Sequence, residues 1–153
     1  MDGPQRAELI ARDRAVIVAV DLQQRLAPAI DGIDAVKRHA TRLLRAAAAL
    51  GVPVIFTEQY PKGLGPTDPA IRETAPAGEV MEKVCFGALG EPANAARFAR
   101  LRAEGRDQAV IFGTETHVGV LHPARLRPAP RRRPWRGQAA ARGGRRAARA
   151  GRA

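Results

Sequence analysis

Three positions in the sequence could bring reactive groups together: Asp21, Lys83 and the turn around Gly119. Asp21 follows the apolar run "AVIVAV", Lys83 lies in "VMEKVCF", and Gly119 lies in "VIFGTETHVGVL". Each lies at or just beyond the carboxyl end of a segment that we expect to be a strand. In an open parallel sheet those ends converge on the crevice where ligands bind. A carboxylate and an ammonium held close together there would keep each other ionised and poised for proton transfer.

Two interpretations of these positions stay open from spacing alone. Asp21 can be a loop carboxylate and Lys83 an exposed lysine on a strand, and charged residues are more often of this plainer kind. The stretch around Gly119 has the shape of an elbow that presents a reactive side chain, an apolar run followed by a turn and the start of a helix. Because glycine has no side chain to present, the stretch is either an elbow without its nucleophile or an ordinary strand-to-helix turn.

Four apolar segments are predicted to be the strands that position these residues. Ala15 to Val20 is a continuous apolar run rich in β-branched residues, which is typical of a strand buried on both faces of a parallel sheet. Three further segments are assigned in the same way. The predicted strands are residues 15–20, 52–57, 79–86 and 108–113.

Helical spacing between the strands predicts a helix from Asp34 to Gly51, with Asp34 as its N-cap and Gly51 at its end. A short helix is expected to open at Asp68 and Pro69, and a longer one to cover residues 91–105. Strands that alternate with helices predict an α/β fold with a right-handed, mostly parallel sheet.

The net charge is concentrated at the carboxyl end of the chain. Of 26 Lys and Arg residues, 11 are arginines between Pro123 and Ala153, a segment without Asp or Glu, so the other 15 balance the 15 acidic residues of positions 1–122. In that segment of 31 residues, 28 are Ala, Arg, Pro or Gly. We therefore expect a folded but incomplete domain over residues 1–122, followed over 123–153 by a disordered tail without a strand.

Length and composition limit the class of protein further. A chain of 153 residues fits one domain. It has no apolar run near the roughly 18 residues that span a bilayer, and its first residues lack the apolar core of a signal peptide. Cys85 is the single cysteine and cannot form an internal disulfide, which predicts a cytoplasmic protein. The lack of a membrane-spanning run predicts that the protein has no membrane partner.

Four stretches together resemble the isochorismatase-like cysteine hydrolase family, above all its small single-domain members: "RAVIVAVDLQQRLAPAI", "LGVPVIFTEQYPKGLGPT", "VMEKVCF" and "VIFGTETHVGVL". The likeness runs in the right order over residues 9–122. It implies a three-layer α/β/α sandwich with a Rossmann-like sheet of about six strands, of which this chain would carry about four. It also implies hydrolysis of a small-molecule substrate at a C–N or C–O bond, of the amide or vinyl-ether type.

By this resemblance, the family's catalytic triad of Asp, Lys and Cys falls on Asp21, Lys83 and Gly119. In such a site the thiolate attacks an electrophilic carbon, the Asp carries the proton and the Lys supports the charge. The backbone amides of Glu115 and Gly119 would hold the oxyanion, with a cis peptide between Thr114 and Glu115. Glycine at the nucleophile position cannot form a covalent intermediate, so we expect the chain to be inactive as written.

Three nearby residues could be mistaken for a replacement nucleophile or base. Cys85 lies two residues after Lys83 and would share its face of the strand, but it enters from a different strand than the elbow, so a buried structural thiol is the preferred interpretation. The resemblance assigns Thr116 to a turn-stabilising hydroxyl. It assigns His117 to the wall of the substrate pocket or to the start of a helix.

Tyr60 and Phe86 are candidate pocket residues, although core or rim aromatics would explain them equally well. Some members of the family bind a metal through Asp and His residues after the second strand. In this chain that region is "TEQYPKGLGP", which has no His, so we predict no metal site and no cofactor.

The loss of apolar character after His122 leads to two further expectations. A reading-frame shift near codons 119–122 of a GC-rich gene would explain it, and reading the DNA in the other frames tests that hypothesis. A sheet that lacks its last strands would expose one flank of residues 108–113, an association hazard. We therefore expect the chain to be poorly stable or insoluble.

Three functions remain open from the sequence. The first is a hydrolase by descent that has lost its nucleophile. The second is a non-catalytic binding or oligomerisation module with the same fold, since intact relatives often form homo-oligomers. The third is incidental binding of nucleic acid through the Arg-rich tail, which would be sensitive to salt.

Overall fold

The computed structural model describes residues 9–84, 90–114 and 136–139. Over these ranges the chain forms β1 (Ala15–Val20), η1 (Ala27–Ala29), α1 (Ile33–Leu50), β2 (Val54–Gln59), α2 (Pro61–Leu64), α3 (Pro69–Arg72), β3 (Glu79–Lys83), α4 (Pro92–Ala103), β4 (Gln108–Gly113) and β5 (Arg136–Ala139). All four predicted strands are present, with bounds that shift by a few residues.

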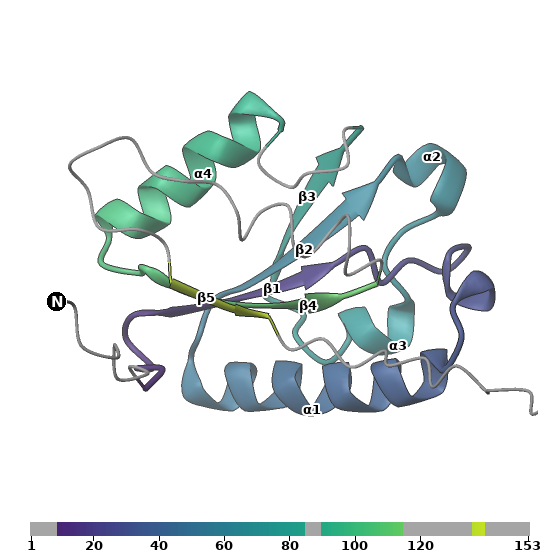
Figure 1. Ribbon diagram of the computed structural model, residues 1–153, viewed down its shortest axis with the longest axis horizontal. Coiled ribbons are helices and arrows are strands. Elements are labelled where there is room, and N and C mark those ends of the chain that lie inside the picture. Colours follow the sequence, from purple (N-terminus) through teal and green to yellow (C-terminus); the bar gives the residue numbers. More distant parts are fainter. Residues whose placement is uncertain (1–8, 85–89, 115–135, 140–153) are drawn as a thin grey trace, which may run out of the picture.

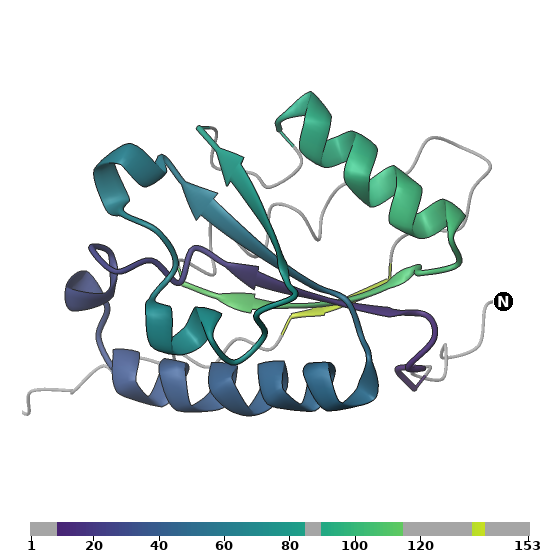
Figure 2. The same cartoon turned by 180° about the vertical axis from the view of Figure 1, so that it is seen from behind.

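The strands form one sheet in the order β3-β2-β1-β4-β5, and every neighbouring pair is parallel. Figure 1 shows α1 and α3 along one face of this sheet and α4 against the opposite face, and the view from behind agrees (Figure 2). The expected α/β/α sandwich with a Rossmann-like parallel sheet is therefore confirmed.

β1 lies at the centre of the sheet, and all six of its residues are buried. Its side chains alternate between two apolar clusters. Ala15, Ile17 and Ala19 pack with Leu44 of α1, whereas the intervening valines pack with Phe98 of α4. A strand covered on both faces must be apolar throughout, which explains the unbroken run in the sequence.

The ends of α1 differ in how well they were predicted. Gly51 ends the helix in the left-handed region, at φ 66°, and donates its N–H to the carbonyls of Ala47 and Ala48, as expected of a glycine cap. The expected N-cap is wrong, because Gly32 holds that position and Asp34 lies in the first turn. A carboxylate there still interacts favourably with the positive end of the helix dipole.

β5 corrects the expectation that no strand follows residue 122. Residues Arg136–Ala139 pair with Gln108–Ile111 of β4, so this stretch of β4 is covered and is not an open flank. The prediction relied on side-chain character, which the segment lacks. A ladder at a sheet edge is made by backbone N–H and C=O groups, and an unpaired edge can accept a segment of almost any side-chain composition.

Candidate active site

Asp21 follows β1 directly and is held in an unusual backbone conformation at the carboxyl edge of the sheet. Its φ is 53°, in the left-handed region that few residues other than glycine adopt, and it is 3% exposed. Thr114, just after β4, donates its hydroxyl to the carbonyl of Asp21 at 2.8 Å and its N–H to that of Val20 at 3.0 Å. Surrounding hydrogen bonds thus maintain a conformation that is costly on its own, a pattern common at functional sites.

The close approach of β4 to β1 at this point requires a glycine. Gly113 has φ 148°, and a Cβ on it would lie 2.0 Å from the carbonyl oxygen of Val20. No side chain fits at that distance, so Gly113 allows Thr114 to reach the end of β1.

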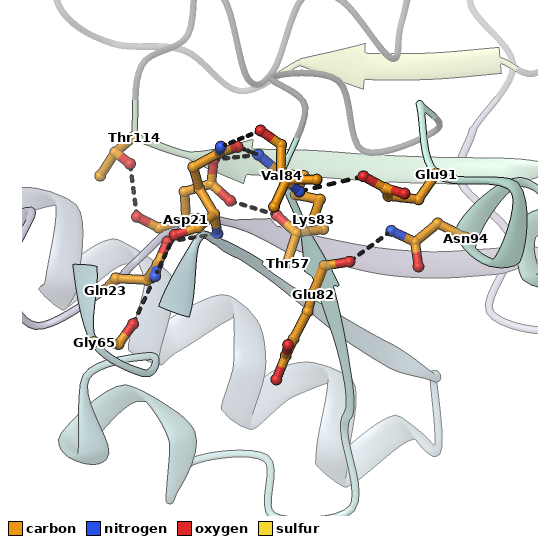
Figure 3. Close-up of polar contacts among 11 residues, drawn as sticks. Asp21, Gln23, Thr57, Gly65, Glu82, Lys83, Val84, Glu91, Asn94 and Thr114 are labelled. Carbon is orange, nitrogen blue, oxygen red and sulfur yellow. Dashed lines mark hydrogen bonds and ion pairs between the residues drawn. The ribbon is translucent and has the colours of Figure 1, made fainter. Parts of the chain in front are cut away.

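Lys83, the last residue of β3, forms a buried ion pair with Asp21 (Figure 3). Its Nζ lies 2.8 Å from Oδ2 of Asp21, and the two side chains are 1% and 4% exposed. The two residues are 62 positions apart in the chain, and the sheet order places β1 and β3 on either side of β2. The plainer interpretation of two exposed surface charges is therefore wrong, while the chemical role of the pair stays a prediction.

Two residues of β2 complete the immediate surroundings of the pair. Thr57, which is fully buried, donates its hydroxyl to Oδ1 of Asp21 at 2.8 Å. Gln59 accepts a hydrogen bond from Nζ of Lys83 at 2.8 Å. Each oxygen of the Asp21 carboxylate thus has a donor, as burial of a charged carboxylate requires.

Helix α4 and Glu91, the residue that precedes it, contact the backbone of the chain on both sides of Lys83. Asn94 donates its side-chain amide to the carbonyl of Glu82 at 3.2 Å, and the N–H of Val84 donates to the carboxylate of Glu91 at 3.3 Å (Figure 3). These contacts satisfy backbone groups at the edge of the sheet and hold Lys83 facing the site.

Two buried polar side chains fix the loop after β2: Gln23, from the chain after β1, and Glu58, from β2 itself. Gln23 is 0% exposed and donates to the carbonyl of Gly65 at 2.6 Å. Glu58 is 6% exposed and accepts both the N–H and the hydroxyl of Thr67, at 2.7 and 2.8 Å. The loop between β2 and α3 is therefore fixed at the rim of the site.

Of the expected pocket residues, only Tyr60 falls in the described part of the chain. It follows β2 with φ 38°, donates its N–H to the carbonyl of Lys83 at 2.8 Å and is 54% exposed, which fits a rim position better than a core position. The other candidate residues lie outside the described residues: Cys85, Phe86, Glu115, Thr116, His117 and Gly119, together with the peptide bond expected to be cis.

Two carboxylates that lie away from the Asp21–Lys83 ion pair have lowered pKa values. Burial raises the pKa of Asp68, but hydrogen bonds from Lys37 and Ala70 and the charge of Lys37 outweigh it, so the net pKa is lowered. The hydrogen bond from Arg14 lowers the pKa of Asp107, against a smaller opposing effect of burial. Both groups stabilise the fold only while ionised.

Neither a membrane-spanning helix nor a metal-binding cluster is found in the described ranges. None of the helices there has the length and hydrophobicity that crossing a bilayer requires. Nor do three or more His, Cys, Asp or Glu side chains gather there as metal ligands would. The predicted absence of a metal stays a prediction.

The fold and the site define a class of protein. It is a parallel α/β sandwich that holds a buried carboxylate and ammonium in contact at the carboxyl edge of its sheet. The sequence model of the isochorismatase domain family matches residues 15–126. The chain therefore belongs to this family of isochorismatase-like hydrolases.

Curated relatives agree with this assignment. Isochorismatase domain-containing protein 1 of Salmo salar is 40% identical over 109 residues, which cover 71% of this chain and 37% of that protein. Isochorismatase domain-containing protein 2A of Mus musculus is 32% identical over 118 residues, covering 75% of this chain and 53% of that protein. The chain thus spans between about a third and a half of the length of these relatives.

Solved structures also resemble the chain. The MAR1 ribonuclease of Caenorhabditis elegans is 30% identical with a TM-score of 0.66, over 75% of this chain and 57% of that one. The YcaC gene product of Escherichia coli, described as an octameric hydrolase of unknown specificity, has a TM-score of 0.69 over 79% of this chain and 60% of that one. At 23% identity, the second likeness shows the fold alone.

The sequence analysis missed Thr57, Gln59, Gln23 and Thr114. A signal for two of them was present, because Thr57 and Gln59 lie at the carboxyl end of β2 at the two-residue spacing that places side chains on one face of a strand. Neither Gln23 nor Thr114 carries such a pattern, since both lie outside the strands and bond to backbone groups 36 and 93 positions away in the chain.

Proposed function

We propose that the chain carries the active site of an isochorismatase-like hydrolase for a small molecule with a scissile C–N or C–O bond, of the amide or vinyl-ether type. Asp21 accepts and returns a proton, and Lys83 balances the charge of the carboxylate as it does so. The observation that supports this most is the buried contact of 2.8 Å between Nζ of Lys83 and Oδ2 of Asp21. A buried ion pair contributes little to stability compared with apolar packing, so a functional reason accounts better for its presence.

Gly119 limits the chemistry that this chain can perform. In the proposed mechanism a thiol at position 119 attacks the substrate after giving its proton to Asp21, and the backbone amides of Glu115 and Gly119 hold the oxyanion. Glycine retains the amide and lacks the nucleophile. We therefore expect the chain as printed to bind a small substrate without hydrolysing it by the covalent route.

The variant Gly119→Cys tests this proposal. We expect it to hydrolyse at least one compound in a panel of small amides, esters and vinyl ethers, whereas the unsubstituted protein, with Gly119, should hydrolyse none. The matched control adds Asp21→Asn, which keeps the size of the side chain and the contact with Thr57 but removes the proton acceptor; it should abolish the gained activity. A folded Gly119→Cys variant that is inactive on the whole panel argues for the alternative of a non-catalytic binding or oligomerisation module.

Binding of nucleic acid through the Arg-rich tail is the second candidate. Its support is the set of 11 arginines without acidic neighbours between Pro123 and Ala153, together with a relative described as a ribonuclease. Each phosphate contact contributes a slope of about −0.9 in a plot of log affinity against log salt for duplex DNA. Fluorescence anisotropy should give a steep slope for the full chain and a flat one after truncation at His122; equal slopes would exclude the tail as the binding element.

A further inference from the structure

Gln59 links the buried ion pair to the segment that follows β3. Its Oε1 accepts a hydrogen bond from Nζ of Lys83 at 2.8 Å, and its Nε2 donates to the carbonyl of Val84 at 2.8 Å. The opposite orientation of the amide would set an NH₂ group against an ammonium and an oxygen against a carbonyl. The network therefore allows one orientation only, and Gln59 cannot exchange its two partners.

Gln23 in turn fixes the main chain of Gln59. Its Oε1 accepts the N–H of Gln59 at 2.8 Å, while its Nε2 donates to the carbonyl of Gln59 at 3.0 Å and to that of Gly65. The side-chain amide of Gln23 thus bonds to both the N–H and the carbonyl of Gln59. It satisfies the backbone groups that a neighbouring strand would otherwise satisfy at this end of β2. Gln23 is 0% exposed, so these hydrogen bonds are shielded from competition with water.

These contacts matter because a lysine side chain does not orient itself. Four rotatable bonds separate its ammonium from the backbone, and the ammonium is a point charge with three donors and no preferred direction. The contact with Asp21 uses one donor at 2.8 Å, and Gln59 uses a second. Because the amide of Gln59 is neutral, it restrains the ammonium without adding a negative charge beside Asp21.

We propose that Gln59, with its main chain held by Gln23, is a positioning residue that sets the ammonium of Lys83 against Asp21. The catalytic meaning of this role rests on the proposed function, whereas the positioning itself can be measured in the chain as printed. Gln59 also couples the pair to Val84, so that the ammonium and the start of the segment after β3 move together.

The direct readout is the NMR signal of the Lys83 ammonium, through its rate of proton exchange with water. In the printed chain we expect a slowly exchanging signal from this buried group. The variant Gln59→Met, which matches the length of glutamine and lacks its acceptor, should raise the exchange rate about tenfold, as expected for the loss of one hydrogen bond to a charged group. Gln59→Glu restores an acceptor and should keep exchange slow.

Two further variants keep the test decisive. Gln24→Met makes the same chemical change at an exposed glutamine, the residue that follows Gln23 in the chain, and should leave the Lys83 signal unaltered. If Gln59→Met does not fold, Gln59→Asn withdraws the acceptor by one methylene and should have the same effect. Unchanged exchange at Lys83 in a folded Gln59 variant, as judged by circular dichroism, would overturn the positioning role.

An activity measurement separates this inference from the proposed function. In the Gly119→Cys background, Gln59→Met should lower kcat and leave KM within about twofold, because positioning of the proton-transfer pair matters after the substrate binds. If Gln59→Met lowers the melting temperature but leaves kcat unchanged, the role of Gln59 is structural only, and this result would also overturn the inference. If the Gly119→Cys protein hydrolyses nothing, the proposed function fails and the exchange experiment alone decides the positioning role.

Discussion

Replacing Lys83 by methionine should destabilise the fold strongly, because it leaves a buried charge without its partner. The carboxylate of Asp21 is 4% exposed and would lose the ammonium at 2.8 Å, keeping only the hydroxyl of Thr57 as a side-chain donor among the contacts described. Removing one partner of a buried pair costs about 3–5 kcal/mol. Domains of this kind have a total stability of about 5–15 kcal/mol, so the effect would be a large share of it.

Urea unfolding followed by circular dichroism measures this cost, and the chain offers a matched control. Lys37 and Asp68 form an ion pair of similar length, 2.6 Å, but the lysine side chain is 34% exposed. Lys37→Met should therefore cost about 1 kcal/mol or less. Adding Asp21→Asn to Lys83→Met should recover about 2 kcal/mol, since the unpaired charge is then gone. If Lys83→Met costs no more than Lys37→Met, the pair is not electrostatically isolated from water and the reasoning fails.

Three further predictions concern the elements around the site. Gly113→Ala should cost about 2 kcal/mol or more in the same unfolding assay, because its Cβ would lie 2.0 Å from the carbonyl oxygen of Val20; a neutral effect would contradict the close approach of β4 to β1. The pKa of Asp107 is lowered, so its ion pair with Arg14 stabilises the fold fully above the unfolded pKa near 3.8. This stabilisation is lost as the pH falls through the lower pKa of the folded state. The difference in unfolding free energy between the chain and Asp107→Asn should therefore be constant near neutrality and vanish in acid; a difference that persists in acid would contradict this assignment. Truncation after residue 135 removes β5 and should promote association in size-exclusion chromatography, whereas truncation after residue 139 removes only the last arginines and should not; equal behaviour would mean that β5 does not protect β4.

The strands and the central acid could be predicted because their signals are local. An unbroken apolar run of six residues has few other uses than a strand buried on both faces, and Asp21 is conspicuous as the charge that ends it. The contact with Lys83 needed one more step, the convergence of parallel strand ends at one edge of the sheet.

The remaining features could not be predicted because they depend on backbone contacts. β5 joins the sheet through its main chain, which any sequence except proline supplies, so its poor side-chain pattern was misleading. The spacing of Gln59 from Thr57 indicates a shared face of β2 but not the partners of the Gln59 amide. Those partners, Lys83 of β3 and the following Val84, are 24 and 25 positions away in the chain, and no sequence pattern indicates them. The N-cap of α1 was misassigned because Gly32 adopts a left-handed conformation without a side-chain signal, while Asp34 resembles the usual cap.

The most direct test of the account is the reactivity of a thiol introduced at position 119. In the Gly119→Cys variant, alkylation by iodoacetamide at pH 7 can be followed by mass spectrometry of digested peptides, which separates position 119 from Cys85. A thiol that can pass its proton to Asp21 beside Lys83 should react about tenfold faster than the same thiol in the Gly119→Cys, Asp21→Asn protein. Equal rates in the two proteins would mean that residue 119 does not meet the ion pair, and the hydrolase site proposed for this chain would be wrong.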